Sequence, residues 1–448
     1  MTDTICALAT APARAAIGVI RLSGPEAFRI AGEVLRYAGD NRLIGENERR
    51  NLSFGRICDG DETVDEAVIC AFRAPHSYTG EDSVEFSCHG GVYLLSRVQG
   101  LLISHGARQA QAGEFTKRAF LNGKTDLIRA EGVVDLIDAD HREAARLALR
   151  SLEGAVGRAV KETEEQLLAV AAQLLAFVDY PDDEIGEVDP GELKMQLDQI
   201  ERRLTALCDS YEQGRLIREG VRTVLCGRPN VGKSSLLNRI AGQERAIVTD
   251  QAGTTRDTVD IGVIFGGCKL ILTDTAGLRE TNDAVERIGV DRAYAAAEQA
   301  DLVLCVFDGD DGDLSLGKAW KEQGKTVAVL FNKRDLSYPL PDLPYTPDGV
   351  FEVSAKTGAG LDALGAWLQE RYGAGRQKNG EIIAGERQHA CLVRVTEAVR
   401  RAQAALDYSC DAVLLEIESA LAAVGELTGK TVSDRIVNEI FSRFCVGK

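Results

Sequence analysis

Gly227-Arg-Pro-Asn-Val-Gly-Lys-Ser234 decides the fold, because it fits the pattern G-x-x-x-x-G-K-[ST]. The apolar run Val221–Cys226 before it predicts a buried strand, and Leu236–Ile240 after it has helical spacing. In a strand, glycine loop and helix, successive backbone N–H groups converge on an anion, and the helix N-terminus adds its positive end. The stretch therefore predicts a phosphate-binding loop in which Lys233 reaches the terminal phosphates and Ser234 offers its hydroxyl to Mg²⁺.

Two further motifs downstream predict a nucleotide-dependent switch. Gly253-Thr-Thr-Arg-Asp257 contains Thr255, the predicted switch hydroxyl on Mg²⁺, with Thr254 as the alternative. A hairpin of strands Val259–Phe265 and Lys269–Thr273, turning at Gly266-Gly267, then leads into Asp274-Thr-Ala-Gly277. The aspartate would hold Mg²⁺ through water and the glycine amide would sense the γ-phosphate, so loss of that phosphate would release the following segment.

Two later motifs predict the base that is bound. Asn332-Lys-Arg-Asp335 follows the apolar strand Val327–Phe331, and Ser354-Ala-Lys356 follows Phe351-Glu-Val353. The Asp335 carboxylate can accept from the ring N–H and amino group of guanine, whereas adenine offers no such pair of donors. Backbone amides of the second motif would contact the base carbonyl. All five motifs stand in order at predicted strand ends, where open α/β sheets bind ligands, and together they predict a GTPase domain.

Composition limits the remaining possibilities. At 448 residues the chain is too long for one compact core, and its net charge of −17 argues against a broad phosphate-binding surface. Any RNA contact is expected to be local or shared with a more basic partner. No apolar run approaches the ~20 residues of a membrane span, and the N-terminus has no signal-peptide pattern, so we expect a cytoplasmic protein without a membrane partner. The 11 cysteines are scattered and include no C-x-x-C, which favours reduced thiols.

Hydrophobic periodicity predicts a multidomain protein of α/β and α parts. The N-terminal part mixes strands such as Ala16–Leu22 with helices such as Glu26–Ala38, which indicates an α+β domain. Long helical patterns flank the nucleotide module on both sides, so a Ras-like P-loop domain is inserted into a discontinuous helical domain. The predicted boundaries are 1–118 for the N-terminal domain, 119–215 and 377–448 for the two helical parts, and 216–376 for the GTPase domain.

Several polar features have more than one interpretation. The acidic stretch Asp179–Pro190 could hold a metal, but a solvated connection between helices is favoured. Cys88 and His89 lack a metal-spaced partner and are interpreted as core or turn residues. Asn230 could place its side-chain carbonyl oxygen on a monovalent cation near the phosphates, although its residue type alone favours a loop hydrogen bond. Leu278 occupies the position of the glutamine that orients water in Ras-type enzymes, so another group must do so.

Across its whole length the chain resembles one family, the tRNA-modification GTPase MnmE, also called TrmE. The resemblance rests on Gly18–Gly24, on Tyr78–Asp82 with His89-Gly-Gly91, and on Gly113–Leu127. It also rests on the P-loop with Gly253–Asp257 and on the C-terminal Phe444-Cys-Val-Gly-Lys448. The chain departs from the family's common pattern at Ala112, where proline is usual, and at Val446, where isoleucine is usual. Neither change removes a functional group, and only the turn at Ala112 is put in doubt.

The resemblance implies a K⁺-stimulated GTPase that dimerises. With the flavoprotein partner MnmG, in a heterotetrameric complex, it would add a (carboxymethyl)aminomethyl group at C5 of the tRNA wobble uridine. The N-terminal domain would bind 5-formyl- or 5,10-methylene-tetrahydrofolate through Arg21, Glu85, Lys124 and the terminal Lys448. Glutamate can accept from the pterin donor edge, and the cations can pair with the folate carboxylates.

The same resemblance assigns the nucleotide site residue by residue. K⁺ would be enclosed by Asn230, Thr249, Gln251 and Thr254, and Mg²⁺ by Ser234 and Thr255. Glu286 would position the attacking water, and Lys233 and Arg256 would also act in catalysis. GTP or GDP would contact Asn230, Val231, Gly232, Lys233, Ser234, Ser235, Thr249, Thr254, Thr255, Asp274, Thr275, Ala276, Gly277, Asn332, Lys333, Asp335, Ser354, Ala355 and Lys356.

Cys445 matches a family cysteine once thought to act on tRNA, but a buried thiol at a helix end is favoured here. Two other functions remain open. One is a regulatory GTPase of the ribosome-assembly type that binds RNA or protein without modifying it. The other is a folate-dependent one-carbon transferase acting alone. The absence of an evident catalytic base or nucleophile in residues 1–118 counts against this second function.

Overall fold

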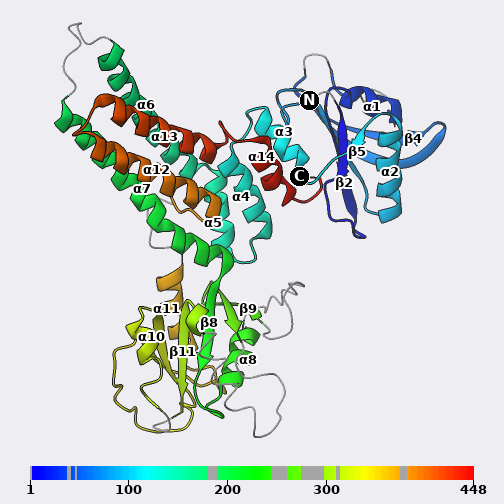
Figure 1. Cartoon of the computed structure of the whole chain (residues 1–448). Coiled ribbons are helices and arrows are strands. Elements are labelled where there is room, and N and C mark those ends of the chain that lie inside the picture. The colour runs from blue at the N-terminus through cyan, green and yellow to red at the C-terminus, as the bar shows by residue number, and fades with distance from the viewer. Residues whose placement is uncertain are drawn as a thin grey trace. The chain divides into compact units, whose positions relative to one another are not determined.

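The computed structural model describes residues 3–37, 42–45, 48–179, 189–243, 260–273, 297–308, 313–373 and 381–447. These residues form two compact units (Figure 1). The first contains residues up to 134 together with 422–448, and the second contains 135–421. This division groups most of the helical part and the nucleotide-binding part into one unit, and so it differs from the predicted domain boundaries. The predicted boundaries stay a prediction. In the described part of the chain, no helix combines the length and apolarity needed to cross a membrane.

A seven-stranded sheet forms the centre of the first unit, in the order β3-β4-β5-β6-β2-β1-β7. Its strands are β1 (Ile5–Leu8), β2 (Ile17–Ser23), β3 (Leu35–Arg36), β4 (Arg50–Asp59), β5 (Glu62–Phe72), β6 (Ser83–His89) and β7 (Arg108–Gln109). Helices α1 (Ala27–Val34) and α2 (Val92–Ser104) bury apolar side chains against it, among them Ile30 and Val98. The predicted helix Glu26–Ala38 is wrong at its end, because Leu35-Arg36 pair with β4 instead. Tertiary pairing overrides the local helical spacing there.

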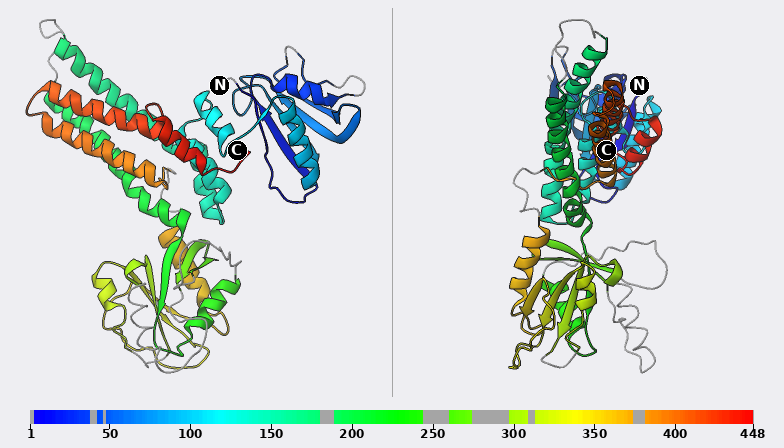
Figure 2. Two further views of the ribbon diagram at one scale, coloured as in Figure 1. Left: turned by 45° about the vertical axis from the view of Figure 1, so that its right-hand side comes forward. Right: turned by 60° about the vertical axis from the view of Figure 1, so that its left-hand side comes forward.

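Some stretches that hydrophobic periodicity predicts as continuous helical tracts are several shorter helices in the structure. The tract from Ala119 to Leu152 is broken into three helices, partly because Gly123 has φ of 68°. In chain order the helices are α3 (Glu114–Leu121), α4 (Leu127–Asp138), α5 (Arg142–Leu152), α6 (Ala155–Asp179), α7 (Pro190–Glu219), α12 (Glu386–Ala405), α13 (Cys410–Thr428) and α14 (Asp434–Ser442). In the second unit α7 packs along α12, as both views in Figure 2 show. Most of the acidic stretch Asp179–Pro190 lies outside the described residues.

The nucleotide module is an α/β fold around a six-stranded sheet in the order β13-β12-β11-β8-β10-β9. Its elements are β8 (Val221–Cys226), α8 (Lys233–Gln243), β9 (Asp260–Phe265), β10 (Cys268–Thr273), β11 (Leu302–Phe307), α10 (Lys318–Glu322), β12 (Thr326–Phe331), β13 (Gly349–Glu352) and α11 (Leu361–Tyr372). All neighbours are parallel except β9 and β10, so the predicted hairpin is confirmed. Apolar clusters cover both faces of the sheet, and the carboxyl ends of β8 and β12 carry the predicted loops.

Candidate functional site

The glycine loop has the backbone geometry of a phosphate cradle. Gly232 has φ of 94°, and a Cβ there would lie 2.3 Å from the Asn332 amide nitrogen, so only glycine fits. Asn230 is also left-handed, with φ of 63°. Asn230, Ser234 and Ser235 are exposed, while Val231 is buried. Lys233, the first residue of α8, donates to the carbonyl oxygens of Gly227 and Arg228, at 2.7 Å each.

Asn332 joins three loops of the site. Its side-chain nitrogen donates to the carbonyl oxygen of Val231 at 2.8 Å, and its side-chain oxygen accepts from the Ala355 N–H at 2.9 Å. The side chain is buried, so both hydrogen bonds are protected from water. Arg239 of α8 adds a link to the same region by donating to the carbonyl oxygen of Lys356 at 2.6 Å. The structure therefore brings the phosphate loop and both base-recognition loops together.

Asp335 is held as an acceptor. Ser354 donates to its Oδ1 at 2.7 Å, and this hydrogen bond holds the pKa of the Asp335 carboxyl below its usual range. The carboxylate stays ionised at neutral pH and can accept from two donors on one ligand edge. Lys333 has φ of 61° and its Nζ lies 2.6 Å from Asp308 Oδ2, at the end of β11.

The switch region of the site lies outside the described residues. This concerns Thr249, Gln251, Thr254, Thr255, Arg256, Asp274, Thr275, Ala276, Gly277 and Glu286, whose assignments stay predictions. Of the predicted Mg²⁺ and K⁺ ligands, the structure describes Ser234 and Asn230. Both residues are exposed and carry a side-chain oxygen atom, and oxygen atoms are the ligands that such hard cations prefer.

In the first unit, Arg21 and Glu85 face each other across β2 and β6. Arg21 Nε donates to Glu85 Oε1 at 2.8 Å, and both side chains keep partial exposure. The guanidinium also lies 5.3 Å from the Tyr78 ring centroid and 5.5 Å from that of Phe115. The two aromatic neighbours were not predicted as site residues, although Tyr78 begins one of the motifs quoted above. The arrangement combines a charged pair with two cation–π contacts, and of the two rings Tyr78 is 43% exposed while Phe115 is fully buried.

The C-terminal tail reaches this same pair. Val446 bridges to Ala112, and Gly113 donates to the carbonyl oxygen of Cys445 at 3.3 Å. Gly447 has φ of 98°, and a Cβ there would lie 2.2 Å from the carbonyl oxygen of Leu8. Arg21 then donates to the carbonyl oxygen of Gly447 at 3.5 Å. Lys448 is the next residue and lies outside the described range.

The structure also describes four other residues that were singled out from the sequence. Lys124 donates to the carbonyl oxygen of Pro75 at 2.9 Å, and its side chain packs near Gly80. Cys88 is buried, as expected of a core residue, whereas the exposed His89 ring lies 2.6 Å from Asp65, which raises the pKa of His89. The expectation that Cys445 is buried is wrong, because it follows α14 in an extended tail and is exposed.

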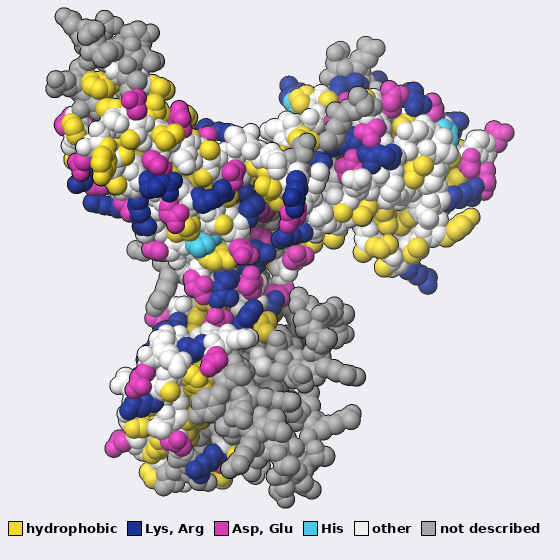
Figure 3. Space-filling model, in the orientation of Figure 1, with side chains coloured by type: hydrophobic (Ala, Val, Ile, Leu, Met, Phe, Trp, Pro, Cys, Tyr) yellow, Lys and Arg dark blue, Asp and Glu magenta, His cyan; other side chains and the backbone are white. Residues whose placement is uncertain are grey.

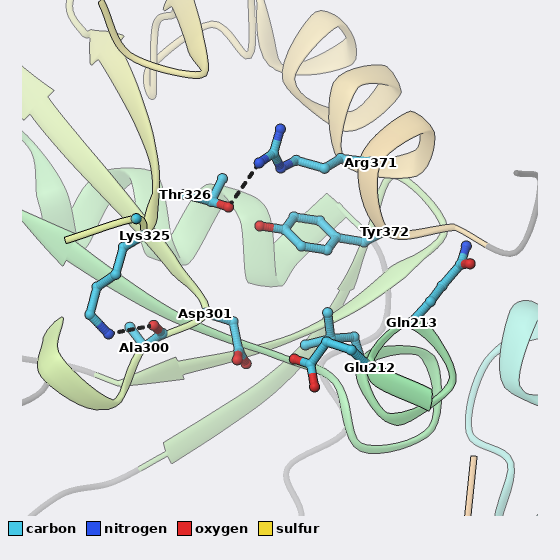
Figure 4. A pocket seen from close by; sticks show the side chains of 10 residues that line it. Glu212, Gln213, Ala300, Asp301, Lys325, Thr326, Arg371 and Tyr372 are labelled. Atoms are coloured by element: carbon cyan, nitrogen blue, oxygen red, sulfur yellow. Dashed lines mark hydrogen bonds between the residues drawn. The ribbon is translucent and has the colours of Figure 1, made fainter. Parts of the chain in front are cut away.

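A cavity of about 510 Å³ lies at the opposite, amino-terminal edge of the parallel strands (Figure 4). It is lined by Glu212 and Gln213 of α7, by Asp301 before β11, and by Arg371 and Tyr372 of α11. Arg215 Nη2 pairs with Asp301 Oδ1 at 2.9 Å beside it. Because the glycine loop follows the carboxyl end of β8, this cavity is separate from the phosphate site and belongs to the junction between α7 and the sheet.

The sheet order, the glycine loop and the Asn332–Asp335 and Ser354–Lys356 loops define a P-loop protein of the GTPase class. The family profiles described as the GTP-binding protein TrmE N-terminus and the MnmE helical domain match residues 4–124 and 127–445, respectively. A protein of Thermus thermophilus named tRNA modification GTPase MnmE is 42% identical over 451 residues, covering 100% of both chains. One of the same name from Porphyromonas gingivalis is 37% identical over 465 residues, covering 100% of this chain and 98% of that protein.

The chain therefore belongs to the family of tRNA modification GTPases called MnmE. It is a GTPase of that family, whose members act in tRNA modification. The resemblance inferred from the motifs is confirmed, as is the multidomain fold with its inserted Ras-like GTPase part.

Proposed function

We propose that K⁺ stimulates GTP hydrolysis by this protein and that hydrolysis serves modification at C5 of the tRNA wobble uridine. The protein would act as a homodimer with the flavoprotein MnmG, in the cytoplasm, and add a (carboxymethyl)aminomethyl group using a one-carbon tetrahydrofolate. The observation that carries the nucleotide part is Asn332, which ties the glycine loop to the loop of Ser354 and Ala355 beside an ionised Asp335. Similarity over the full chain supports the rest.

The proposal assigns a task to each of the main described residues of the nucleotide site. Backbone N–H groups of the glycine loop bind phosphate oxygens, and Lys233 exchanges its loop carbonyl partners for the terminal phosphates. Asp335 accepts from the guanine edge, and Ala355 stays fixed by Asn332. Ser234 would hold Mg²⁺ and Asn230 would hold K⁺, and these cations would neutralise charge on the phosphates. Acidic and basic side chains are interspersed over the face drawn in Figure 3. Because a broad phosphate-binding surface would be mainly basic, this mixed charge fits a subunit that shares tRNA binding with a partner.

The folate proposal rests on the surroundings of Arg21. Glu85 is an acceptor for pterin donors, and the partly exposed Tyr78 ring offers a face. In the tail, Gly447 contacts Arg21 and immediately precedes Lys448 in the sequence. Lys124 would add a cation for the folate carboxylates. The pair Arg21 and Glu85 would bind and orient the ligand, whose one-carbon group supplies the carbon for the modification.

Gly447→Ala is expected to weaken 5-formyl-tetrahydrofolate binding about tenfold. A Cβ would meet the carbonyl oxygen of Leu8 at 2.2 Å, and a positive φ of 98° disfavours alanine, so the tail should leave its seat. Isothermal titration calorimetry measures the affinity. Gly100→Ala is the matched control, because Gly100 lies within α2 with nothing within 4 Å of an added Cβ. Equal affinities of both variants and the wild type would remove the tail from the folate site.

The experiment that tests the proposed function is GTP hydrolysis by the purified protein in KCl and in NaCl at equal ionic strength. We expect K⁺ to accelerate the reaction by at least about tenfold, because a bound cation stabilises charge developing between the β- and γ-phosphates. Asn230→Ala should lose most of this stimulation. Equal slow rates in both salts would contradict the cation site and favour a plain regulatory switch that binds RNA or protein.

A further inference from the structure

The segment that carries Asp335 closes on itself through a side chain that no motif includes. Tyr338 donates its hydroxyl hydrogen to the carbonyl oxygen of Asn332, at the start of the segment. Arg334 Nη1 donates to the carbonyl oxygen of Tyr338 at 2.6 Å, at its end. The Arg334 guanidinium also lies over the Tyr338 ring, 4.8 Å from its centroid. These contacts form a closed loop from Asn332 to Tyr338, with Asp335 within it.

A second set of contacts ties this loop to the other base-recognition segment. Arg334 Nε pairs with Glu352 Oε2 at 2.7 Å, and the Arg334 N–H donates to the carbonyl oxygen of Val353 at 3.1 Å. Glu352 is the last residue of β13, and Val353 immediately precedes Ser354. Arg334 thus connects Tyr338 on one side with the strand end that presents Ser354 on the other.

The loop needs such support because its backbone is strained. Lys333 is a non-glycine residue with φ of 61°, a left-handed conformation that is unfavourable for a residue with a side chain and that surrounding contacts must hold. The flanking residues Asp335, Leu336 and Ser337 are exposed, so apolar packing does little to fix them. The contacts of Arg334 and Tyr338 therefore act on the backbone of the loop, while Ser354 holds the Asp335 carboxylate itself.

We propose that Arg334 and Tyr338 are positioning residues for guanine specificity, which set the Asp335 carboxylate against the two donors of the base. Neither side chain needs to touch the nucleotide. Arginine suits this task better than lysine, because its planar fork donates to two partners while its face stacks on the ring. The inference rests on guanine recognition by Asp335, which forms part of the proposed function.

The test compares GDP with IDP, whose base lacks the amino group that guanine carries at C2. Tyr338→Phe removes one hydroxyl and keeps the ring under Arg334. We expect the Kd of GDP to rise about tenfold and that of IDP only about threefold, because two hydrogen bonds to the carboxylate depend on position in GDP and one in IDP. At saturating GTP the kcat should stay unchanged while KM rises. Arg334→Ala should act in the same direction, and Arg334→Lys should restore little.

Tyr408→Phe is the matched control, because Tyr408 is 84% exposed and far in sequence from the site. Equal rises of the Kd for GDP and IDP, or no rise at all, in both Tyr338→Phe and Arg334→Ala would overturn the proposal. Asp335→Asn separates the two levels of the argument. If it reduces the preference for GDP while the other variants do not, only the positioning role fails. If it leaves the preference unchanged, guanine recognition by Asp335 fails instead.

Discussion

Asp335→Asn is expected to weaken GTP binding by roughly a hundredfold or more. In the proposed complex the carboxylate would accept from the N1–H and the amino group of guanine, and hydrogen bonds to a charged group contribute about 1.5–3 kcal/mol each. In the variant, an amide nitrogen replaces one acceptor with a donor, so one guanine donor is left opposite another donor. The loop should keep its shape, because Ser354 can still donate to the remaining amide oxygen.

Xanthine nucleotides provide the sharper half of this experiment. Xanthine carries a carbonyl at C2 in place of the amino group, and the asparagine amide can donate to it. We therefore expect Asp335→Asn to gain affinity for XDP while it loses affinity for GDP, measured by competition against a fluorescent nucleotide. Tyr408→Phe is a suitable control here too, because Tyr408 is 84% exposed and belongs to none of the nucleotide loops. Unchanged GDP affinity in Asp335→Asn would refute the assignment.

The meeting of the glycine loop with the Asn332–Asp335 and Ser354–Lys356 loops was predictable from the sequence, because each of these motifs follows a strand of the sheet. Buried runs such as Val327–Phe331 end at the sheet's carboxyl edge, so their following residues must meet there. The hairpin of β9 and β10 was predictable from its glycine turn. The pattern could not predict the support by Tyr338 and Arg334, because a tyrosine or an arginine in a loop does not by itself indicate which group it contacts.

The N-terminal site was less predictable from residues alone. Arg21 and Glu85 are 64 residues apart in sequence and meet only through the antiparallel register of β2 and β6. The seat of the tail depends on Gly113 and Gly447, and their positive φ values become visible only in the folded chain. The family resemblance supplied the site residues, whereas the aromatic neighbours Tyr78 and Phe115 came from the structure.

Arg118→Met is expected to destabilise the first unit by about 3 kcal/mol. Arg118 is fully buried and pairs with Asp3 at 2.9 Å, Glu81 at 3.1 Å and Glu114 at 3.1 Å. Removal of one partner from a buried ionic cluster typically costs 3–5 kcal/mol, because the remaining buried charges lose their compensation. Here those charges are Glu81 and Glu114, since Asp3 is 46% exposed. Arg108 still pairs with Glu114 at 2.6 Å, which places the expected loss at the lower end of that range.

Calorimetry of the full chain can assign this loss to one unit. Both tryptophans, Trp320 and Trp367, lie in the nucleotide module, so tryptophan fluorescence follows the second unit. GDP should raise the melting transition of that unit alone. In Arg118→Met the transition insensitive to GDP should fall, while the fluorescence transition stays in place. Arg29→Met is the control, because Arg29 is 49% exposed and solvent screens its pairs with Glu26 and Glu33.

The pH dependence gives an independent measure of the same cluster. Burial would raise the pKa of Glu114, but hydrogen bonds from Arg108, the Gln111 N–H and Arg118 outweigh it and lower the pKa. Arg108 and Arg118 likewise lower the pKa of Asp3. Since the unfolded chain binds these protons more tightly, the stabilisation is present above about pH 4 and is lost as pH falls through the folded pKa values. Arg118→Met should flatten this acid dependence. If the variant is as stable as the wild type and has the same acid profile, the carboxylates of Asp3, Glu81 and Glu114 do not depend on Arg118 for their stabilisation.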